Sequence, residues 1–495
     1  MTAAFAAALC NPALGAAPRD QPGLGAAPRA QTGLAAGPRD QPGLGAAPRA
    51  QTGLTEAAAE QIGNRAYEYG IPLMEFLRQA RQQTSVTVPD ALSDAPINQL
   101  GNARRLDTAA NQVIVQPNND TLYTMGHLDL SRGPLVLHVP AVPNHRYYSF
   151  AFLDPYTNVF RYVGTRSTGD PPGNFLITGP GFHGSVPPGA QPIHSRYRRV
   201  WLVGRTLVLG PGDLPAVHRI QNGYRLVPLR QYLAHGLDWR PPRPATVVTK
   251  PKTFREPGGV EFFDRLGAAL AQNPPPRRDA PLLRQLRKVG VGPGLDPSAE
   301  HLSLPVLAGL TAAGDHGARN VLRLRTQLAV RSIAANDGWF VPPPLNGSYG
   351  TDYGYRAVVA LFGLAANRPQ EALYIVGAAS PGHGLLNGAH RYVLHFPAGQ
   401  LPPARYFWSL TMYDENFHLV ANPLHRYELG SRSSGLRRNP DGSLDIHIQR
   451  SRPAGNVSNW LPAPSGTFEV TLRMYGPRPS ALNHKYRYPP IEQTG

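Results

Sequence analysis

Three short polar segments of this 495-residue chain carry the side chains best suited to acid–base chemistry. "QPNNDTLY" contains Asp120, "LDPYTNVF" contains Asp154, and "YGTDYGYR" contains Asp352 and Arg356. A carboxyl group can give or take a proton, and a neighbouring arginine can orient an anionic group. We therefore predict that these four residues are catalytic, provided that the three segments meet in one cleft.

Amide, hydroxyl and aromatic side chains near these segments complete the predicted site, because they can hydrogen-bond a ligand or form an apolar wall beside it. The predicted ligand-binding residues are Asn118, Asn119, Thr121, Tyr156, Asn158, Tyr349, Tyr353, Trp408 and Trp460. Structural alternatives stay open, because Asn and Asp beside a strand also tie down turns and tryptophans also pack in cores.

Other chemistries lack their sequence signatures. The chain has no G-x-S-x-G elbow, no H-E-x-x-H motif and no phosphate-binding loop with its lysine. "GVGPG" at 290–294 follows a helical pattern rather than a strand, so it does not predict a dinucleotide loop. His383, His390 and His395 are irregularly spaced, and we predict neither a metal nor a cofactor.

The formal charge of +17 raises the question of a nucleic-acid partner. All but four of the 49 basic residues are arginines, and Gly and Pro are also abundant, as a GC-rich coding sequence would produce. The densest basic clusters are short and scattered. We expect no specific nucleic-acid partner, whereas a small-molecule or glycan ligand and a homo-oligomer stay open.

The N-terminal segment repeats every ten residues between 14 and 54, as in "GLGAAPRDQP". Each copy offers too little apolar surface to offset its ordering entropy, so we predict that residues 1–54 are a disordered arm. The start lacks the positive region of a secretory signal, and the single cysteine, Cys10, cannot form an intramolecular disulfide. No apolar run is long enough for a transmembrane helix.

Hydrophobic periodicity predicts the elements that must position the polar segments. A helix is expected from Thr55 to a stop at Gly70 and Pro72, followed by a second amphipathic segment, then strands to about residue 210 and helices over 255–335. After residue 370 the period is two, with Thr411, Glu469 and Arg473 on faces expected to meet water. We predict an α+β fold, predominantly β, with two antiparallel sandwich-like or jelly-roll-like domains.

The predicted organisation has five parts. They are a disordered arm (1–54), an N-terminal β-rich domain with leading helices (55–250), a helical connector and linking segment (251–370), a C-terminal jelly-roll-like domain (371–480) and a tail (481–495).

The strings "AYEYGIPL", "VQPNNDTLY", "RYYSFAFLDPYTNVF" and "VWLVGRTLV" resemble, in order, the N-terminal domain of unknown function 1254. "HRYVLHFPAGQLPPARYFWSLTMYD" and "NWLPAPSGTFEVTLRMY" similarly resemble its usual C-terminal companion, the domain of unknown function 1214. The resemblance covers roughly residues 58–480 and implies two β-rich domains with a helical insert. Bacterial members are often exported, which favours an extracytoplasmic or particle-associated location.

The chain departs from the family pattern in two places. The decapeptide repeat is not part of that pattern, and Pro381 and His383 stand in "ASPGHGLLNGAHRY", where an acidic turn is more familiar. A cation held at that turn in relatives is therefore not expected here.

The resemblance supplies no reaction, and three classes of function stay open. A hydrolase or lyase for a small organic substrate would gather the predicted carboxylates with Arg356. A ligand-binding or carbohydrate-binding sandwich would expose aromatic side chains on one sheet face and perturb no carboxylate. A structural or envelope protein would present a shallow surface and oligomer contacts.

Overall fold

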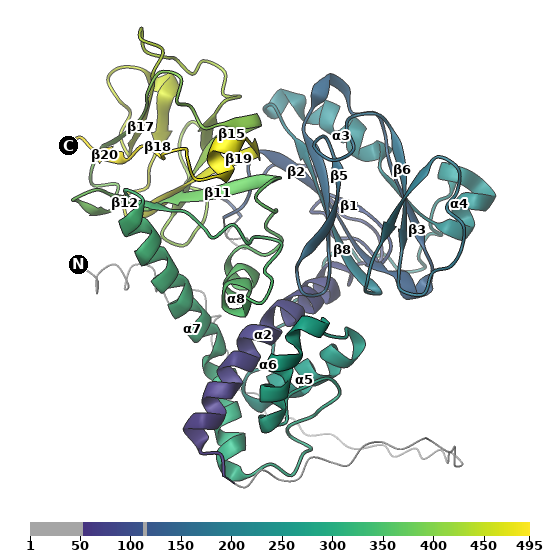
Figure 1. The fold of residues 1–495 in the computed structure, drawn as a ribbon. Helices are drawn as coiled ribbons and strands as arrows, with labels where there is room; N and C mark the ends of the chain where they lie inside the picture. Colours follow the sequence, from purple (N-terminus) through teal and green to yellow (C-terminus); the bar gives the residue numbers. More distant parts are fainter. Residues whose placement is uncertain (1–52, 112–115) are drawn as a thin grey trace, which may run out of the picture.

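The computed structural model describes residues 53–111 and 116–495, and it places two β-rich units side by side above a body of helices (Figure 1). The predicted α+β class is confirmed. The predicted predominance of β structure is wrong, because two long helices bring the helical content level with the strand content. The predicted arm falls outside the described residues except for its last two positions.

The N-terminal β unit consists of two sheets. The first has the strand order β1-β2-β8-β4-β5, formed by β1 (Gly101–Asn102), β2 (Thr121–Asp129), β8 (Arg199–Leu207), β4 (Tyr148–Leu153) and β5 (Val159–Gly164). The second has the order β7-β6-β3-β9, formed by β7 (Ala190–His194), β6 (Gly173–Thr178), β3 (Leu135–Val139) and β9 (Arg225–Pro228). Apolar side chains of both sheets share one core, to which Leu137 and Phe150 belong.

The C-terminal β unit repeats this arrangement. One sheet has the order β10-β11-β19-β15-β16, formed by β10 (Trp339–Phe340), β11 (Ala372–Gly377), β19 (Phe468–Pro477), β15 (Ala404–Asp414) and β16 (Glu428–Gly430). The other has the order β18-β17-β14-β20, formed by β18 (Trp460–Pro462), β17 (Leu444–Gln449), β14 (Tyr392–Phe396) and β20 (Ile491–Gln493). A small hairpin joins β12 (Ala379–Ser380) to β13 (Gly384–Leu385).

The sheets are not purely antiparallel, so that part of the prediction is wrong. β7 runs parallel to β6, and β18 runs parallel to β17. In both cases a loop longer than a tight hairpin precedes the second strand, and such a loop allows the chain to return in the same direction.

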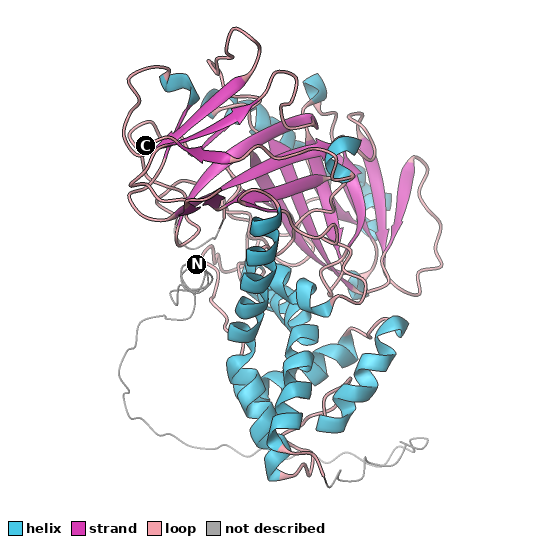
Figure 2. Cartoon of the chain, turned by 60° about the vertical axis from the view of Figure 1, so that its left-hand side comes forward, coloured by secondary structure: helices cyan, strands magenta, loops and turns pink. Residues whose placement is uncertain are grey.

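The helical body consists of α2 (Glu56–Gln83), α5 (Gly259–Gln272), α6 (Ala280–Leu286), α7 (Leu304–Ala335) and α8 (Tyr353–Phe362). Shorter helices, α3 (Leu214–Gly223), α4 (Leu229–His235) and α9 (Pro479–Leu482), lie on the β units. The long helices gather on one side of the molecule and the strands on the other (Figure 2). The leading helix α2 packs against α7, α8 and α5 in this body. The predicted domain boundaries stay predictions.

The predicted helix end at Gly70 and Pro72 is wrong, because α2 continues through both residues to Gln83. A proline inside a helix costs about 3 kcal/mol. Ile71, Leu73 and other apolar residues of this stretch are buried, and burial of one such side chain contributes about 1.5–3 kcal/mol. Tertiary packing therefore outweighs the local stop signal.

The polar side of β15 and β19 does not face water as predicted. Thr411, Glu469 and Arg473 are 0%, 6% and 4% exposed. Arg473 donates to the carbonyl of Gln116, which shows that this side of the sheet packs on the N-terminal β unit. Alternation identifies a polar face, but it cannot distinguish water from a polar protein surface.

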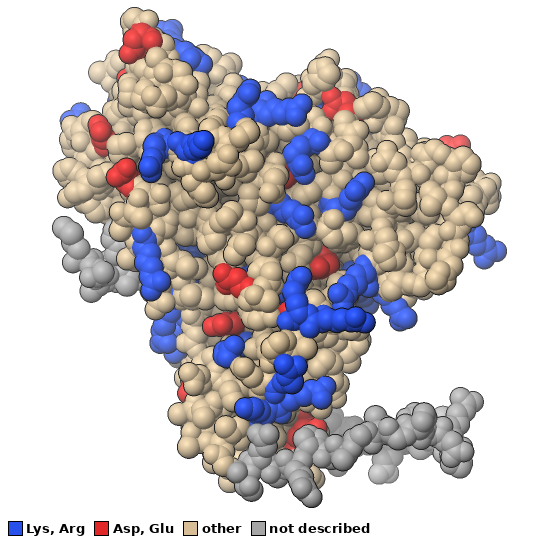
Figure 3. Space-filling model, in the orientation of Figure 1, with Lys and Arg blue, Asp and Glu red and all other residues tan. Residues whose placement is uncertain are grey.

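Basic side chains lie in separate groups over both β units and the helical body on the face drawn in Figure 3. Within the described ranges, no helix combines the length and the apolar character that crossing a bilayer requires.

We predict that Gly309→Ala destabilises the crossing of α2 and α7. A Cβ at position 309 would lie 2.4 Å from the carbonyl oxygen of Glu56, a backbone atom that cannot move alone. The expected loss is about 1–3 kcal/mol of unfolding free energy in urea titrations. Ala318→Gly, on an exposed part of α7, measures helix propensity alone. A gain of about 1 kcal/mol in Gly309→Ala, as propensity alone predicts, would contradict the close crossing.

Candidate functional site

Asp120 lies where the two β units meet. The residue directly precedes β2 and is 0% exposed, so its carboxyl group is buried. Oδ2 accepts hydrogen bonds from Ser409 Oγ at 2.8 Å and from Tyr475 OH at 3.4 Å. Oδ1 forms an ion pair with Nη2 of Arg432. All three partners belong to the C-terminal β unit, so one buried carboxylate joins the two units.

The residues before Asp120 hold its turn. Asn118 Oδ1 accepts from the backbone N–H of Asp120 at 2.6 Å and of Thr121 at 3.3 Å. Asn118 Nδ2 also donates to Tyr475 OH at 3.0 Å, across the interface. Asn119 Nδ2 donates to the carbonyl of Asp107 at 2.6 Å. These polar side chains therefore form the turn and attach it to the other unit.

Glu428 is the second carboxyl group of this network. Its Oε1 lies 3.2 Å from Arg432 Nη2, the same nitrogen that pairs with Asp120. Burial, followed by the nearby charge of Asp120, raises the pKa of Glu428 well above its ordinary value, while Arg432 opposes the rise. Glu428 therefore holds its proton to a higher pH than a free glutamate does, next to a carboxylate that already accepts from three donors.

Two arginines balance these carboxyl groups. Arg473 donates to Thr411 Oγ1 at 2.8 Å and to Tyr413 OH at 2.7 Å, and Arg432 stacks 4.4 Å from the centre of the Phe407 ring. The side chains of Glu428 and Arg432 are 19% and 14% exposed. They form the side of the network that faces solvent.

Two buried atoms of these side chains have no hydrogen-bond partner in the described part of the chain. Among the described residues, Glu428 Oε2 and Arg432 Nε are buried and make no hydrogen bond. Since buried polar groups are normally satisfied, these two atoms mark where a ligand or water would bind.

A second group of predicted residues gathers around α8. Asp154, in the turn between β4 and β5, accepts from the backbone N–H of Tyr156 at 2.9 Å and of Asn158 at 3.0 Å. Burial raises the pKa of Asp154 to about 6, although hydrogen bonds and Arg356 oppose the rise. Tyr349 joins this group, because its backbone N–H lies 3.5 Å from Asn158 Oδ1.

Arg356 is 1% exposed and lies among the rings of Tyr69, Tyr156 and Tyr353. Asp352 instead begins α8, since its side chain accepts from the backbone N–H of Tyr355 at 2.9 Å. Its observed contacts are those of a helix cap.

The two predicted tryptophans belong to neither group. Trp408 is 4% exposed and packs in the core of the C-terminal β unit. Trp460 is 5% exposed, donates from Nε1 to the carbonyl of Gln449 at 2.8 Å, and lines a surface hollow of about 490 Å³ with Asp414 and Arg450.

The predicted site residues therefore lie in separate places in the structure. Within the described part of the chain, no hydrogen bond, ion pair or ring contact connects Asp120 directly with Asp154 or Arg356. A single cleft shared by all of them stays a prediction. The described residues also contain no cluster of three or more His, Cys, Asp or Glu suited to a metal ion.

Sequence reasoning missed Glu428, Arg432, Ser409 and Tyr475. The available signal was the polar character of one face of strands β15 and β19, where Ser409 and Arg473 alternate with core residues. The same signal predicts a face exposed to solvent, because nothing in the sequence identifies the protein surface that covers it.

Two family models match the chain. One, a protein of unknown function (DUF1254), matches residues 97–228, and another, also a protein of unknown function (DUF1214), matches residues 371–479. The predicted order of the two domains is confirmed.

Two solved structures are similar to the chain. The crystal structure of the VPA0106 protein from Vibrio parahaemolyticus has a TM-score of 0.62 at 20% identity, over 88% of this chain and 100% of that one. An uncharacterised protein from Burkholderia cenocepacia has a TM-score of 0.39 at 11% identity, over 88% and 92%. The first likeness is one of fold. No curated protein matches the chain.

We predict that Asp120→Asn lowers the unfolding free energy by about 1.5–3 kcal/mol, because it removes the charge that pairs with buried Arg432 while preserving the shape. Urea unfolding at pH 7 measures this loss. Asp441→Asn is the matched control, because Asp441 ties a turn with its carboxyl on the surface. Equal small losses of unfolding free energy in both variants would show that Asp120 only holds its turn.

Proposed function

We propose that this chain, which joins a DUF1254 domain to a DUF1214 domain, is an acid–base enzyme, a hydrolase or lyase that acts on a small organic substrate. One observation carries the proposal. A single guanidinium nitrogen, Nη2 of Arg432, lies between the carboxyl groups of Asp120 and Glu428, which come from different domains. Ligand sites are common at domain interfaces, and paired carboxyls with different protonation states divide the roles of acid and base.

The proposed roles follow from the contacts. Glu428 is the general acid, because its raised pKa favours the protonated form and its Oε2 has no hydrogen-bond partner among the described residues. Arg432 orients an anionic or carbonyl oxygen of the substrate through its free Nε–H. Asp120 is a positioning residue that holds Arg432, and its charge adds to the effect of burial in raising the pKa of Glu428.

The alternative of a carbohydrate-binding sandwich has weaker support. Such a protein stacks sugars on exposed aromatic rings, whereas Trp408 and Trp460 are both at least 95% buried. No observation favours a structural or envelope role.

We further propose that each β unit is a sandwich-like or jelly-roll-like domain, because two sheets share one core in each. Oligomerisation stays a proposal without a specific contact to support it.

The test is turnover by the purified full chain on pools of small esters, lactones and hydroxy acids, followed by mass spectrometry. Glu428→Gln keeps the shape and removes the transferable proton, so turnover should fall about 10²-fold or more. Glu469→Gln is the control, because Glu469 is a buried carboxyl on the same side of the C-terminal sheet and accepts a hydrogen bond from Gln116 instead. Absence of turnover across the pools, an unchanged rate in Glu428→Gln or an equal fall in Glu469→Gln would each contradict the proposal.

The pH dependence of stability gives a test that needs no substrate. Folding raises the pKa of Glu428 above its ordinary value of 4.5, so the folded chain binds a proton that the unfolded chain has released. The stabilisation is complete below pH 4.5 and is lost as the pH rises towards the raised pKa. The amide side chain of the Glu428→Gln variant has no such proton to lose.

Urea unfolding of the wild type and of Glu428→Gln at pH 5 and pH 8 measures this difference. The unfolding free energy of the variant, measured relative to that of the wild type, should be higher at pH 8 than at pH 5. A difference that is the same at both pH values would show that Glu428 does not carry the extra proton.

A further inference from the structure

The guanidinium group of Arg356 is buried with fewer hydrogen-bond acceptors around it than it has nitrogen donors. The residue is 1% exposed, and Nη2 donates to the carbonyl of Tyr69 at 3.3 Å. Its Nε and Nη1 atoms are buried, and no hydrogen-bond partner lies near them in the described residues. Buried N–H groups of a charged side chain are rarely left unsatisfied, because each one costs about 1–3 kcal/mol or more.

Tyrosine rings stabilise this cation only in part. The centres of the Tyr69, Tyr353 and Tyr156 rings lie 5.2, 5.3 and 5.5 Å from its central carbon. Such cation–π contacts contribute about 0.5–2 kcal/mol each. The rings attract the cation as a whole, whereas its N–H groups still need hydrogen-bond acceptors.

The nearby carboxyl groups do not supply those acceptors. Asp279 accepts from Tyr69 OH at 3.0 Å and from Tyr353 OH at 2.9 Å, and Asp154 binds the backbone of its own turn. No ion pair of Arg356 is found among the described residues. The cation therefore keeps in-plane donors directed at no protein acceptor.

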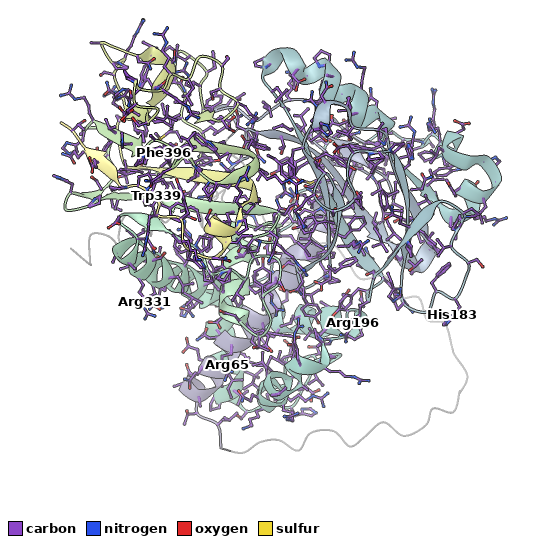
Figure 4. The ribbon with its side chains drawn as sticks, turned by 45° about the horizontal axis from the view of Figure 1, so that its top comes forward. Arg65, His183, Arg196, Arg331, Trp339 and Phe396 are labelled. Atoms are coloured by element: carbon purple, nitrogen blue, oxygen red, sulfur yellow. The ribbon has the colours of Figure 1, made fainter. Side chains whose placement is uncertain are left out.

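Charged groups of both signs lie on the solvent side of Arg356. Tyr353 is half-buried, whereas Tyr69 and Tyr156 are fully buried, so Tyr353 is the ring beside Arg356 that lies nearest to solvent. Exposed Arg278 lies 3.8 Å from Asp279. Arg196 stacks on Tyr197, next to Tyr156, and lies at the junction of the N-terminal β unit with the helical body (Figure 4).

We propose that Arg356 is the base of an anion-binding site, in which its free N–H groups bind a compact anion, either an inorganic ion or the carboxylate of a small organic acid. This site shares no residue with the Asp120–Glu428 network, and it does not depend on that network being catalytic. The anion reaches Arg356 past the Tyr353 ring, and the outer arginines increase its local concentration.

Two measurements on the full chain test the proposal. Crystals soaked in sodium bromide, or in sodium bromoacetate to represent a carboxylate, should show an anomalous bromine peak beside Nε or Nη1 of Arg356. In solution, sodium bromide or sodium acetate should raise the melting temperature along a saturable curve, as a ligand of the folded state does.

Variants separate specific binding from general salt effects. In Arg356→Met the midpoint of the saturable curve should rise at least about tenfold, which corresponds to about 1.4 kcal/mol of binding. Arg205→Met is the matched control, because Arg205 is also buried and stacked on a tyrosine, but it donates to Asn367 and to the carbonyl of Ala365. This variant should keep the wild-type curve.

Saturation by acetate at lower concentrations than bromide identifies a carboxylate site, and the reverse order identifies an inorganic one. Either order supports the proposal. A map with only water at Arg356, or identical salt curves for the wild type and Arg356→Met, would overturn it. If Arg356→Met does not fold, the bromine peak in the wild-type crystal decides alone.

Discussion

The ion pair between Asp120 and Arg432 is the contact on which the arrangement of the two β units depends. The Asp120 side chain is fully buried and the Arg432 side chain is 14% exposed, and each comes from a different unit. Removal of the Asp120 charge alone would leave Arg432 packed in the interface without its partner, at a cost of about 1.5–3 kcal/mol. Charged contacts are also directional, so this pair fixes the orientation of the units as well as their association.

Other polar contacts extend the same interface. Glu371 accepts from Arg166 and from Tyr147 OH, and Arg205 donates to Asn367, in each case between the N-terminal β unit and the region around the start of the C-terminal one. The interface is thus a polar and aromatic surface rather than a continuation of either apolar core. A proton, an ion or a small ligand can change its balance of charges.

The two polar centres, one around Asp120 and one around Arg356, differ in how their positive and negative groups are paired. The Asp120 network contains two arginines and two carboxyl groups, and burial raises the pKa of one of them, Glu428. Around Arg356, the carboxyl groups are occupied by turns and phenols, so that a cation has unused donors. We propose that the first centre serves proton transfer and that the second holds an anion. Helix α2 connects the second centre to the N-terminal β unit, because it carries Tyr69 and also Phe76, which packs edge-on against Trp201.

The sequence alone determined the α+β class, the order of the two family domains and the buried faces of the strands, because hydrophobic alternation is a local property of each strand. It also identified Asp120, Asp154 and Arg356 as unusual polar residues. Tertiary structure decided what these residues contact. Glu428 and Arg432 became part of the site only when a polar sheet face met Asp120, more than 300 positions away. Helix α2 continued through Pro72 because partners distant in sequence bury its apolar side. Periodicity describes which face is polar, but only the packed fold determines whether that face meets water, a second domain or a ligand.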